Sequence, residues 1–250
     1  MKPKVFVAVT TTHGSIQAQF IVTLTQMFAH RTFDMDVWSY QDPYIVLARN
    51  AAAADFLKGD STHILFLDAD IIDPQCSQHI ARMLSHDEAI VGGLYCKKCE
   101  SPGPIWVCNA LDHRPKEDQR GLLPVRHIGT GFLLIKRAVF EKMIEETGDK
   151  IGYLEDETNR PLWDFFDMPR VEGRKMSEDW HFCNEARRLG FTVYGDTKVL
   201  LRHAGGAVYP LKSQLAQTNL AMQKVNLDSQ PNNIGSGGPH RIQEKVNAAA

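Results

Sequence analysis

Two aspartates separated by a single residue, Asp68 and Asp70, directly follow a short apolar run in the stretch HILFLDADIID. A third acid, Asp73, ends the same stretch. Ionised carboxylates repel one another and are costly to remove from water unless a cation or hydrogen-bond donors compensate them. The stretch therefore predicts one of two structures: a turn that simply leaves the core, or a site that binds a divalent metal ion.

The elements that must position these acids follow from the hydrophobic pattern. Strand-like runs occur at residues 5–9, 36–40, 63–67 and 89–95, and helical spacing of apolar residues occurs over 14–27, 48–58 and 75–84. Strands that alternate with helices are typical of an α/β fold with a largely parallel sheet. Ligands of such sheets bind beyond the carboxyl ends of the strands, where Asp68 and Asp70 lie. Thr10, Thr11 and Thr12 lie at the same end of the first strand.

The second half of the chain has a different character. Residues 100–126 carry prolines and charges, and the segment 148–176 is irregular, polar and aromatic. A loop of that length in a compact domain is usually functional, so we expect this segment to close over a bound ligand. Further strands are predicted over 132–135, 192–194 and 198–202, and further helices begin at Lys136 and Ser177.

Composition and charge narrow the classes of protein. The chain has 250 residues, of which 43% are hydrophobic and 23% charged, and its net charge is −2. These values are typical of a globular protein and exclude a global basic field that would attract nucleic acid or acidic lipid. Short basic clusters such as Lys97-Lys98 are interpreted as solvated surface. No apolar run approaches the roughly 20 residues that span a bilayer, so we expect a cytoplasmic protein.

The five cysteines are an odd number, which argues against a disulfide framework. Cys96 and Cys99 have the spacing of half a zinc site, and Cys108 and His113 follow them. The second half of that set matches no standard spacing. Reduced thiols that bind no metal are therefore the favoured interpretation, and a small zinc site is the alternative.

Several short motifs occur in a fixed order and together carry a resemblance. They are Thr10-Thr-Thr12, Ala48-Arg-Asn50, Phe66-Leu-Asp-Ala-Asp70, Gly129-Thr-Gly131, Ser177-Glu-Asp179 and His203. This set resembles the glycosyltransferases of the GT-A fold, of the metal-dependent Asp-x-Asp type. The resemblance implies a Rossmann-like, mostly parallel sheet with flanking helices and a small second sheet. It also implies transfer of a hexose or related sugar from a nucleotide-diphosphate sugar to an acceptor hydroxyl.

The resemblance also suggests how the chain is divided. We expect a single domain over residues 1–213, with a nucleotide-binding half at 1–99 and an acceptor-side half at 100–213. Residues 214–250 are rich in turn-forming residues and are expected to form a flexible tail. The acceptor could be a sugar, a small molecule, a protein or a modified nucleic acid, and the motifs do not distinguish these.

The acids after the third strand and His203 are the expected metal site. A divalent ion that bridges the phosphate oxygens would stabilise the leaving nucleoside diphosphate as a Lewis acid. Oxygen ligands suit Mg²⁺ or Mn²⁺, and an imidazole shifts the preference toward Mn²⁺. Asp70 and His203 are the predicted direct ligands, and by resemblance Asp68 contacts the donor ribose or the metal through water. The alternative is that both acids cap the next helix and His203 has no ligand.

By resemblance, seven residues are expected to bind the nucleotide-sugar donor. They are Asp68, Gly205, Thr10, Thr11, Thr12, Arg49 and Asn50. Thr10, Thr11 and Thr12 would line the nucleoside pocket, although plain strand-end hydroxyls are an equal alternative. Arg49, next to Asn50, would hold a phosphate or orient Asp68 through a bidentate contact, and the alternative is an ordinary solvated residue on a helix of alanines. Gly205 would let the diphosphate approach the backbone.

Glu178 and Asp179 have two interpretations. Acids in the first turn of a helix are stabilised by the helix dipole, so they could simply cap the helix that Ser177 begins. Alternatively, Asp179 is a general base that deprotonates the acceptor hydroxyl, with Glu178 beside it, and the reaction inverts the anomeric centre. An enzyme that retains the anomeric configuration needs no such base.

Two other classes of protein stay open at this point. A nucleotidyltransferase would normally carry a glycine-rich phosphate loop with a lysine or arginine after the first strand. The stretch Thr10-Thr-Thr-His-Gly14 is a poor version of such a loop. A non-catalytic module would bind a nucleotide sugar without turning it over.

Overall fold

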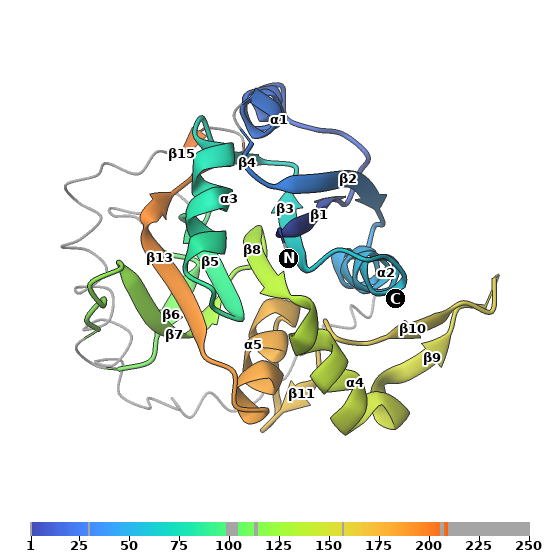
Figure 1. The fold of residues 1–250 in the computed structure, drawn as a ribbon. Coiled ribbons are helices and arrows are strands. Elements are labelled where there is room, and N and C mark those ends of the chain that lie inside the picture. Colours follow the sequence, from blue (N-terminus) through green and yellow to red (C-terminus); the bar gives the residue numbers. More distant parts are fainter. Residues whose placement is uncertain are drawn as a thin grey trace, which may run out of the picture.

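The computed structural model describes residues 2–29, 31–98, 105–112, 115–156, 158–205 and 208–209. Within these ranges, eight strands form one central sheet in the order β2-β1-β3-β8-β5-β13-β7-β6 (Figure 1). The strands are β1 (Lys4–Thr11), β2 (Asp34–Gln41), β3 (His63–Asp68), β5 (Ile90–Leu94), β6 (Cys108–Ala110), β7 (Leu122–Ile128), β8 (Phe132–Lys136) and β13 (Val193–Leu200). The expected tail, residues 214–250, lies outside the described residues.

Most strands of this sheet point the same way. β1 pairs in parallel with both β2 and β3, and β5 pairs in parallel with β13. β8 lies antiparallel between β3 and β5, and β7 lies antiparallel between β13 and β6. Only β7 and β8 therefore run against the other strands of the described sheet. The α/β fold with a mostly parallel central sheet, predicted from the sequence, is confirmed.

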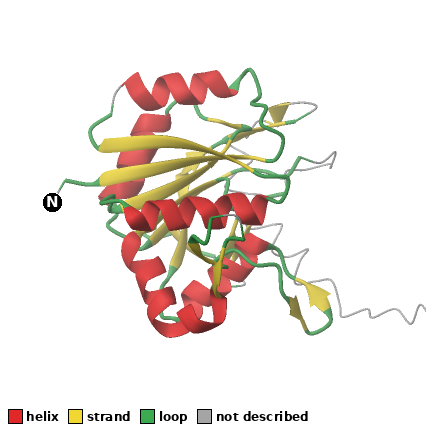
Figure 2. Cartoon of the chain, turned by 90° about the vertical axis from the view of Figure 1, so that its right-hand side faces the viewer, coloured by secondary structure: helices red, strands yellow, loops and turns green. Residues whose placement is uncertain are grey.

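Helices cover both faces of the sheet (Figures 1 and 2). On one face lie α1 (Phe20–Ala29) and α3 (Cys76–Ser85), and on the other lie α2 (Ile45–Lys58), α4 (Arg137–Ile151) and α5 (Glu178–Arg188). The side chains of β1 explain why both faces are covered. Val5, Val7 and Val9 pack into the core beneath α1 and α3, and Phe6 and Ala8 pack into the core beneath α2, α4 and α5. Successive side chains of a strand point to opposite faces, so an apolar residue at every position requires cover on both.

The path of the chain reverses around β1. From β1 the chain crosses to β2 on one side, and from β2 it returns to β3 on the other side. The carboxyl ends of β1 and β3 therefore border a topological switch point, which is where open α/β sheets bind ligands. The register of these two strands places Thr10 directly beside Asp68.

The resemblance implied one small second sheet, and three small sheets accompany the central one. β4 (Ile71–Ile72), β14 (Arg202–Ala204) and β15 (Val208–Tyr209) form a three-stranded sheet. β9 (Gly152–Leu154) pairs with β10 (Pro161–Trp163), and β11 (Arg170–Val171) pairs with β12 (Arg174–Lys175). None of the helices in the described ranges is long and apolar enough to cross a membrane.

The expected start of the first helix was wrong. α1 begins at Phe20, and Ile16 lies before it with half of its surface exposed. Gly14, which was expected to open the helix, has a φ of +66°. This left-handed conformation favours glycine and cannot continue into a right-handed helix. The residues between β1 and α1 instead border the pocket described below.

The segment 148–176 is also more structured than expected. α4 continues into it, and two short hairpins, β9–β10 and β11–β12, follow. Phe165 and Phe166 are buried in the core, where Phe166 stacks on Phe182 of α5 with ring centroids 4.8 Å apart. The two separate strands predicted over 192–202 are instead β13, whose register shifts after Asp196, and β14. Part of the expected mobile loop is thus packed core.

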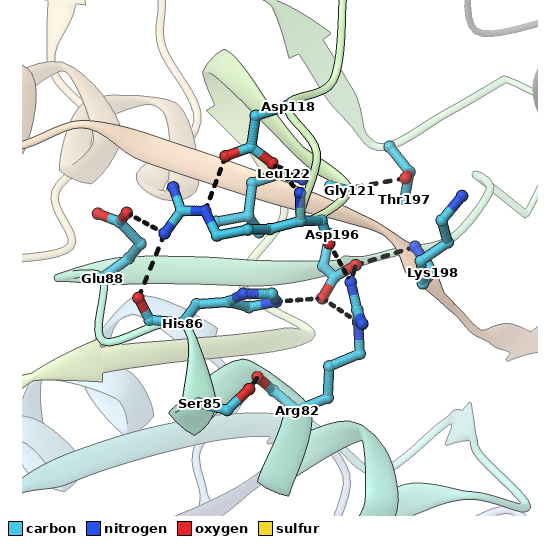
Figure 3. Close-up of polar contacts among 11 residues, drawn as sticks. Arg82, Ser85, His86, Glu88, Asp118, Gly121, Leu122, Asp196, Thr197 and Lys198 are labelled. Carbon is cyan, nitrogen blue, oxygen red and sulfur yellow. Dashed lines mark hydrogen bonds and ion pairs between the residues drawn. The ribbon is translucent and has the colours of Figure 1, made fainter.

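A buried carboxylate ties α3 to the central sheet (Figure 3). Asp196 of β13 is fully buried, and its Oδ2 accepts hydrogen bonds from Arg82 Nε at 2.7 Å and His86 Nε2 at 2.8 Å. Its Oδ1 accepts the backbone N–H of Lys198 at 2.9 Å. A buried charge without such partners would be strongly destabilising, so these three donors explain why an aspartate is tolerated in the sheet.

We expect Asp196→Ala to lower the free energy of unfolding by about 3 kcal/mol, because it leaves Arg82 and His86 without their shared acceptor. Urea unfolding followed by circular dichroism measures the change. Glu145→Ala is the control, since Glu145 forms only an exposed ion pair with Lys142 and its removal should leave the unfolding midpoint unchanged. An Asp196→Ala midpoint equal to that of the wild type would contradict the assigned role.

Candidate functional site

A pocket of about 540 Å³ opens at the carboxyl ends of β1 and β3. This volume is in the range of small-molecule sites. Seven of the eleven predicted site residues line it, namely Thr10, Thr11, Thr12, Arg49, Asp68, Asp70 and His203. Lys98 and His13 also line it, and neither was predicted. Residues that are far apart in the sequence therefore meet at the switch point of the sheet.

Asp68 ends β3 and is fixed in place by its neighbours. Thr10 Oγ1 donates a hydrogen bond to Asp68 Oδ1 at 2.7 Å, and the Asp68 backbone N–H donates to the Gly131 carbonyl at 2.9 Å. A Cβ atom on Gly131 would lie 2.9 Å from Asp68 Oδ2 and 2.7 Å from Tyr95 Oη. The second glycine of the Gly-Thr-Gly motif is therefore required because a side chain would collide with the carboxylate and with Tyr95.

Arg49 is buried and joins two carboxylates from different elements. Its Nη2 donates to Asp68 Oδ1 at 3.2 Å, and its Nη1 contacts Glu178 Oε1 of α5. Burial acts to lower the pKa of Arg49, but Asp68 and Glu178 raise it above its ordinary value, so the guanidinium stays charged. Of the two roles predicted for Arg49, the described contacts match the orientation of Asp68.

Asp70 and His203 are brought together by the pairing of β14 with β4. His203 lies opposite Ile71, and the Ala204 backbone N–H donates to the Asp70 carbonyl at 2.8 Å. His203 Nδ1 lies 2.8 Å from the Cys96 carbonyl oxygen and donates a hydrogen bond to it. The other ring nitrogen, Nε2, lies 3.4 Å from Asp70 Oδ1. The imidazole is thus held with Nε2 toward the carboxylate.

Lys98 completes this group, and the sequence did not indicate it. Its Nζ contacts Asp70 Oδ2, on the other oxygen from the one near His203. Burial acts to raise the pKa of Asp70, but His203 and Lys98 lower it below its ordinary value. Asp70 is therefore ionised at neutral pH. Lys98 is exposed, as expected of a basic surface cluster, but its ammonium is paired with Asp70.

The chemistry of Asp70 and His203 fits a divalent cation. Asp70 Oδ1 is buried and has no hydrogen-bond partner among the described residues, which is costly unless a ligand supplies one. No three His, Cys, Asp or Glu side chains converge in the described part of the chain, and the Asp68 carboxylate faces Thr10 and Arg49. With two protein ligands, Mg²⁺ or Mn²⁺ would complete its coordination with phosphate oxygens and water.

Asn50 does not line the pocket. Its Nδ2 donates to Asp164 Oδ1 at 3.1 Å and to the Phe166 carbonyl at 3.4 Å, and its Oδ1 accepts the Phe166 N–H at 2.9 Å. The side chain is fully buried and fixes the segment between β10 and β11 to α2. Its contacts are structural, although it stands next to Arg49 in the sequence.

Glu178 and Asp179 begin α5 and have different surroundings. Glu178 forms the ion pair with Arg49, whereas Asp179 Oδ1 accepts the Trp180 N–H at 2.8 Å and contacts Ser177 Oγ. Asp179 also acts to raise the pKa of Arg49, less strongly than Asp68, Glu178 and Tyr95 do. Neither acid lines the pocket, but Glu178 contacts Arg49, which in turn contacts Asp68.

The remaining predicted residues are more distant from the pocket. Gly205 follows β14 and is not among the lining residues. Of the possible zinc ligands, Cys99 and His113 lie outside the described residues. Burial, and next the neighbouring Cys96, raises the pKa of the Cys108 thiol to about 12, so this thiol is protonated at neutral pH. The described part of this set gives no support to a zinc site.

An aromatic surface lies next to Asp179. Trp180 is partly exposed and stacks on His127 of β7, with ring centroids 4.3 Å apart and planes inclined by 5°. Burial lowers the pKa of His127 to about 4, so its ring is neutral at pH 7. Stacked rings with one accessible face are suited to contact the apolar face of a sugar. This stack was not predicted from the sequence.

Comparisons with known proteins place the chain by its fold. No family model matches it, and no curated sequence is detectably similar. The structure of A197 from STIV is similar, with 20% identity, a TM-score of 0.50 and coverage of 82% of this chain and 86% of A197. The structure of TarS from S. aureus has 13% identity and a TM-score of 0.42, and the match covers 90% of this chain but 39% of TarS. The described architecture agrees with the GT-A fold that the sequence motifs imply.

Proposed function

We propose that the chain is a metal-dependent glycosyltransferase that moves a sugar from a nucleotide-diphosphate sugar to an acceptor hydroxyl. The observation that carries the proposal is the pocket at the switch point. It combines a carboxylate and imidazole pair, Asp70 and His203, with a second carboxylate fixed by Arg49 and with strand-end hydroxyls. A dianionic diphosphate, a ribose and a divalent ion are the ligand groups that this combination suits.

In this proposal each of the seven predicted residues that line the pocket has a role. Asp70 and His203 hold Mn²⁺ or Mg²⁺, which as a Lewis acid stabilises the negative charge of the departing diphosphate. Asp68, oriented by Arg49 and Thr10, accepts hydrogen bonds from the ribose hydroxyls. Thr11 and Thr12 border the space for the base. The imidazole favours Mn²⁺ over Mg²⁺.

The reaction itself is a displacement at the anomeric carbon. The acceptor oxygen forms the new bond to this carbon, and the bond between the carbon and the diphosphate oxygen breaks. The electron pair of the broken bond leaves with the nucleoside diphosphate. The proton of the acceptor hydroxyl passes to Asp179, the proposed base, whose Oδ2 has no partner among the described residues.

The direct test is a panel of nucleotide sugars incubated with the protein with and without Mn²⁺. One donor should raise the melting temperature only with the ion, because a ligand of the native state stabilises it by mass action. The same donor should release nucleoside diphosphate slowly in the presence of a sugar acceptor and Mn²⁺. Excess chelator should stop this release.

The products distinguish the other classes of protein. Release of pyrophosphate or formation of a nucleotide adduct would identify a nucleotidyltransferase. Binding of a nucleotide sugar without release of any product, across sugar, peptide and nucleic-acid acceptors, would identify a binding module. Full turnover in metal-free protein, with the metal content checked by elemental analysis, would contradict the proposed metal dependence.

A further inference from the structure

The contact between Lys98 and Asp70 places an ammonium group on the carboxylate that is expected to bind the metal ion. Lys98 Nζ contacts Asp70 Oδ2, while Asp70 Oδ1 is buried, has no hydrogen-bond partner in the described part of the chain and lies 3.4 Å from His203 Nε2. One oxygen of the carboxylate thus already has a lysine partner, and among the described residues the other faces only the His203 imidazole. The same side chain serves the lysine and, in the proposed function, the divalent ion.

An ammonium group and a divalent cation on one carboxylate repel each other strongly. Two positive charges about 4 Å apart in a partly buried site oppose each other by several kcal/mol per unit charge. Lys98 has a flexible stem and about a third of its side chain exposed, so it can move away at small cost. A divalent ion that binds Asp70 and His203 would therefore displace the Lys98 ammonium.

The pocket itself offers the displaced ammonium a new partner. Lys98 lines the same pocket as Thr10, Thr11 and Thr12. Arg49 is the other lysine or arginine among the described lining residues. It is already paired with Asp68 and Glu178. A donor diphosphate that enters with the ion carries charge that the ion only partly neutralises, and an ammonium binds phosphate as a point charge.

We propose that Lys98 is an exchangeable counter-ion: it neutralises Asp70 in the metal-free protein, yields it to the divalent ion, and then binds the donor diphosphate. The inference rests on the proposed metal-dependent function and adds a residue to it. It implies that ion and nucleotide bind with positive coupling, because the ion releases the group that holds the nucleotide.

The test compares Lys98→Met with Lys97→Met, which makes the same chemical change at the adjacent, exposed lysine outside the pocket lining. Mn²⁺ binding is measured directly by electron paramagnetic resonance of the free ion, without nucleotide. UDP, GDP, CDP and ADP binding is then measured by calorimetry at saturating Mn²⁺. Neither readout needs turnover.

Lys98→Met should change the two affinities in opposite directions. Its Mn²⁺ affinity should rise about tenfold, because the competing charge is gone. Its affinity for the preferred nucleoside diphosphate should fall about tenfold, because a charge-assisted contact to phosphate is lost. Lys97→Met should behave as the wild type in both measurements.

The outcomes separate this inference from the function on which it rests. Suppose that the wild type binds Mn²⁺, Asp70→Ala does not, and Lys98→Met binds it with unchanged or lower affinity. Lys98 then does not compete with the ion, so this inference is wrong, while the metal site at Asp70 is supported. If Lys98→Met binds Mn²⁺ more tightly than the wild type and nucleoside diphosphate equally well, Lys98 does not bind the donor diphosphate and that part of the proposal is wrong. If no variant binds Mn²⁺, both this inference and the proposed metal dependence fail.

Discussion

The Asp70→Ala protein should lose sugar transfer by about two to three orders of magnitude while it keeps its fold. A Lewis acid at the leaving group is worth several kcal/mol, and each ~1.4 kcal/mol is a factor of ten in rate. The fold should survive because the pairing of β14 with β4 uses the Asp70 carbonyl oxygen, which the substitution leaves in place. Among the described residues, the carboxylate itself contacts only the partly exposed Lys98 and the His203 imidazole, and the fold does not depend on either contact.

Asp60→Asn is the matched control for this prediction. Asp60 precedes the same strand, β3, at its amino end, and its side chain is 82% exposed. Its rate of transfer should equal that of the wild type. The measurement is the rate of nucleoside diphosphate release at saturating Mn²⁺, with the melting temperature recorded for each variant. If Asp70→Ala transfers sugar at the wild-type rate, the assignment of Asp70 as metal ligand is wrong.

The position of the pocket could be predicted because it depends on strand ends. Apolar runs mark β1 and β3 in the sequence, and polar residues that directly follow them must lie at the carboxyl edge of a parallel sheet. This argument places Thr10, Thr11, Thr12, Asp68 and Asp70 at one edge of the sheet, and all five line the pocket. The order of the strands decides that these two ends are neighbours, and the β1–β3 register places Thr10 beside Asp68.

The partners of the charged residues could not be predicted in this way. Arg49 and Glu178 are 129 residues apart, and Lys98 and Asp70 are 28 apart. Nothing in their local sequence distinguishes them from solvated charges, because long-range ion pairs depend on how α2, α5 and the segment after β5 pack. The same holds for Asn50, whose neighbour Arg49 borders the pocket while its own amide is used by Asp164 and Phe166.

Two expected elements failed for identifiable physical reasons. Helical spacing from Ile16 to Met27 predicted a helix over the whole range, but the positive φ of Gly14 and the pocket-lining residues after it delay the start to Phe20. Aromatic residues in 148–176 were taken to belong to a mobile loop. Phe165 and Phe166 fill the core between the sheet and α5 instead, because buried aromatic area is a major source of stability.

The two acids that begin α5 should separate into a catalytic group and a positioning group. Asp179→Asn should lower transfer by about 10²–10⁴, the usual contribution of a positioned acid–base group. Donor affinity and melting temperature should change little. An asparagine Oδ1 can still accept the hydrogen bonds that Ser177 and Trp180 donate to Asp179 Oδ1. What the variant loses is the ability to accept a proton.

Glu178→Gln should give the opposite pattern. It removes one of the two negative charges that compensate the buried Arg49, at a cost of about 1.5–3 kcal/mol for a charged hydrogen bond. The melting temperature should fall. Donor affinity should also fall, because a displaced guanidinium no longer orients Asp68. The rate at saturating donor should drop less than in Asp179→Asn.

The stereochemistry of the product decides between these assignments independently of any substitution. A base that deprotonates the acceptor while it attacks the anomeric carbon from the side opposite the diphosphate inverts that centre. Coupling constants of the anomeric proton distinguish inversion from retention. Retention, or an Asp179→Asn protein that keeps full turnover and loses only melting temperature, would show that Asp179 is a helix cap for α5. The catalytic assignment would then rest on Asp70 and His203 alone, and Glu178 would keep its role as the partner of Arg49.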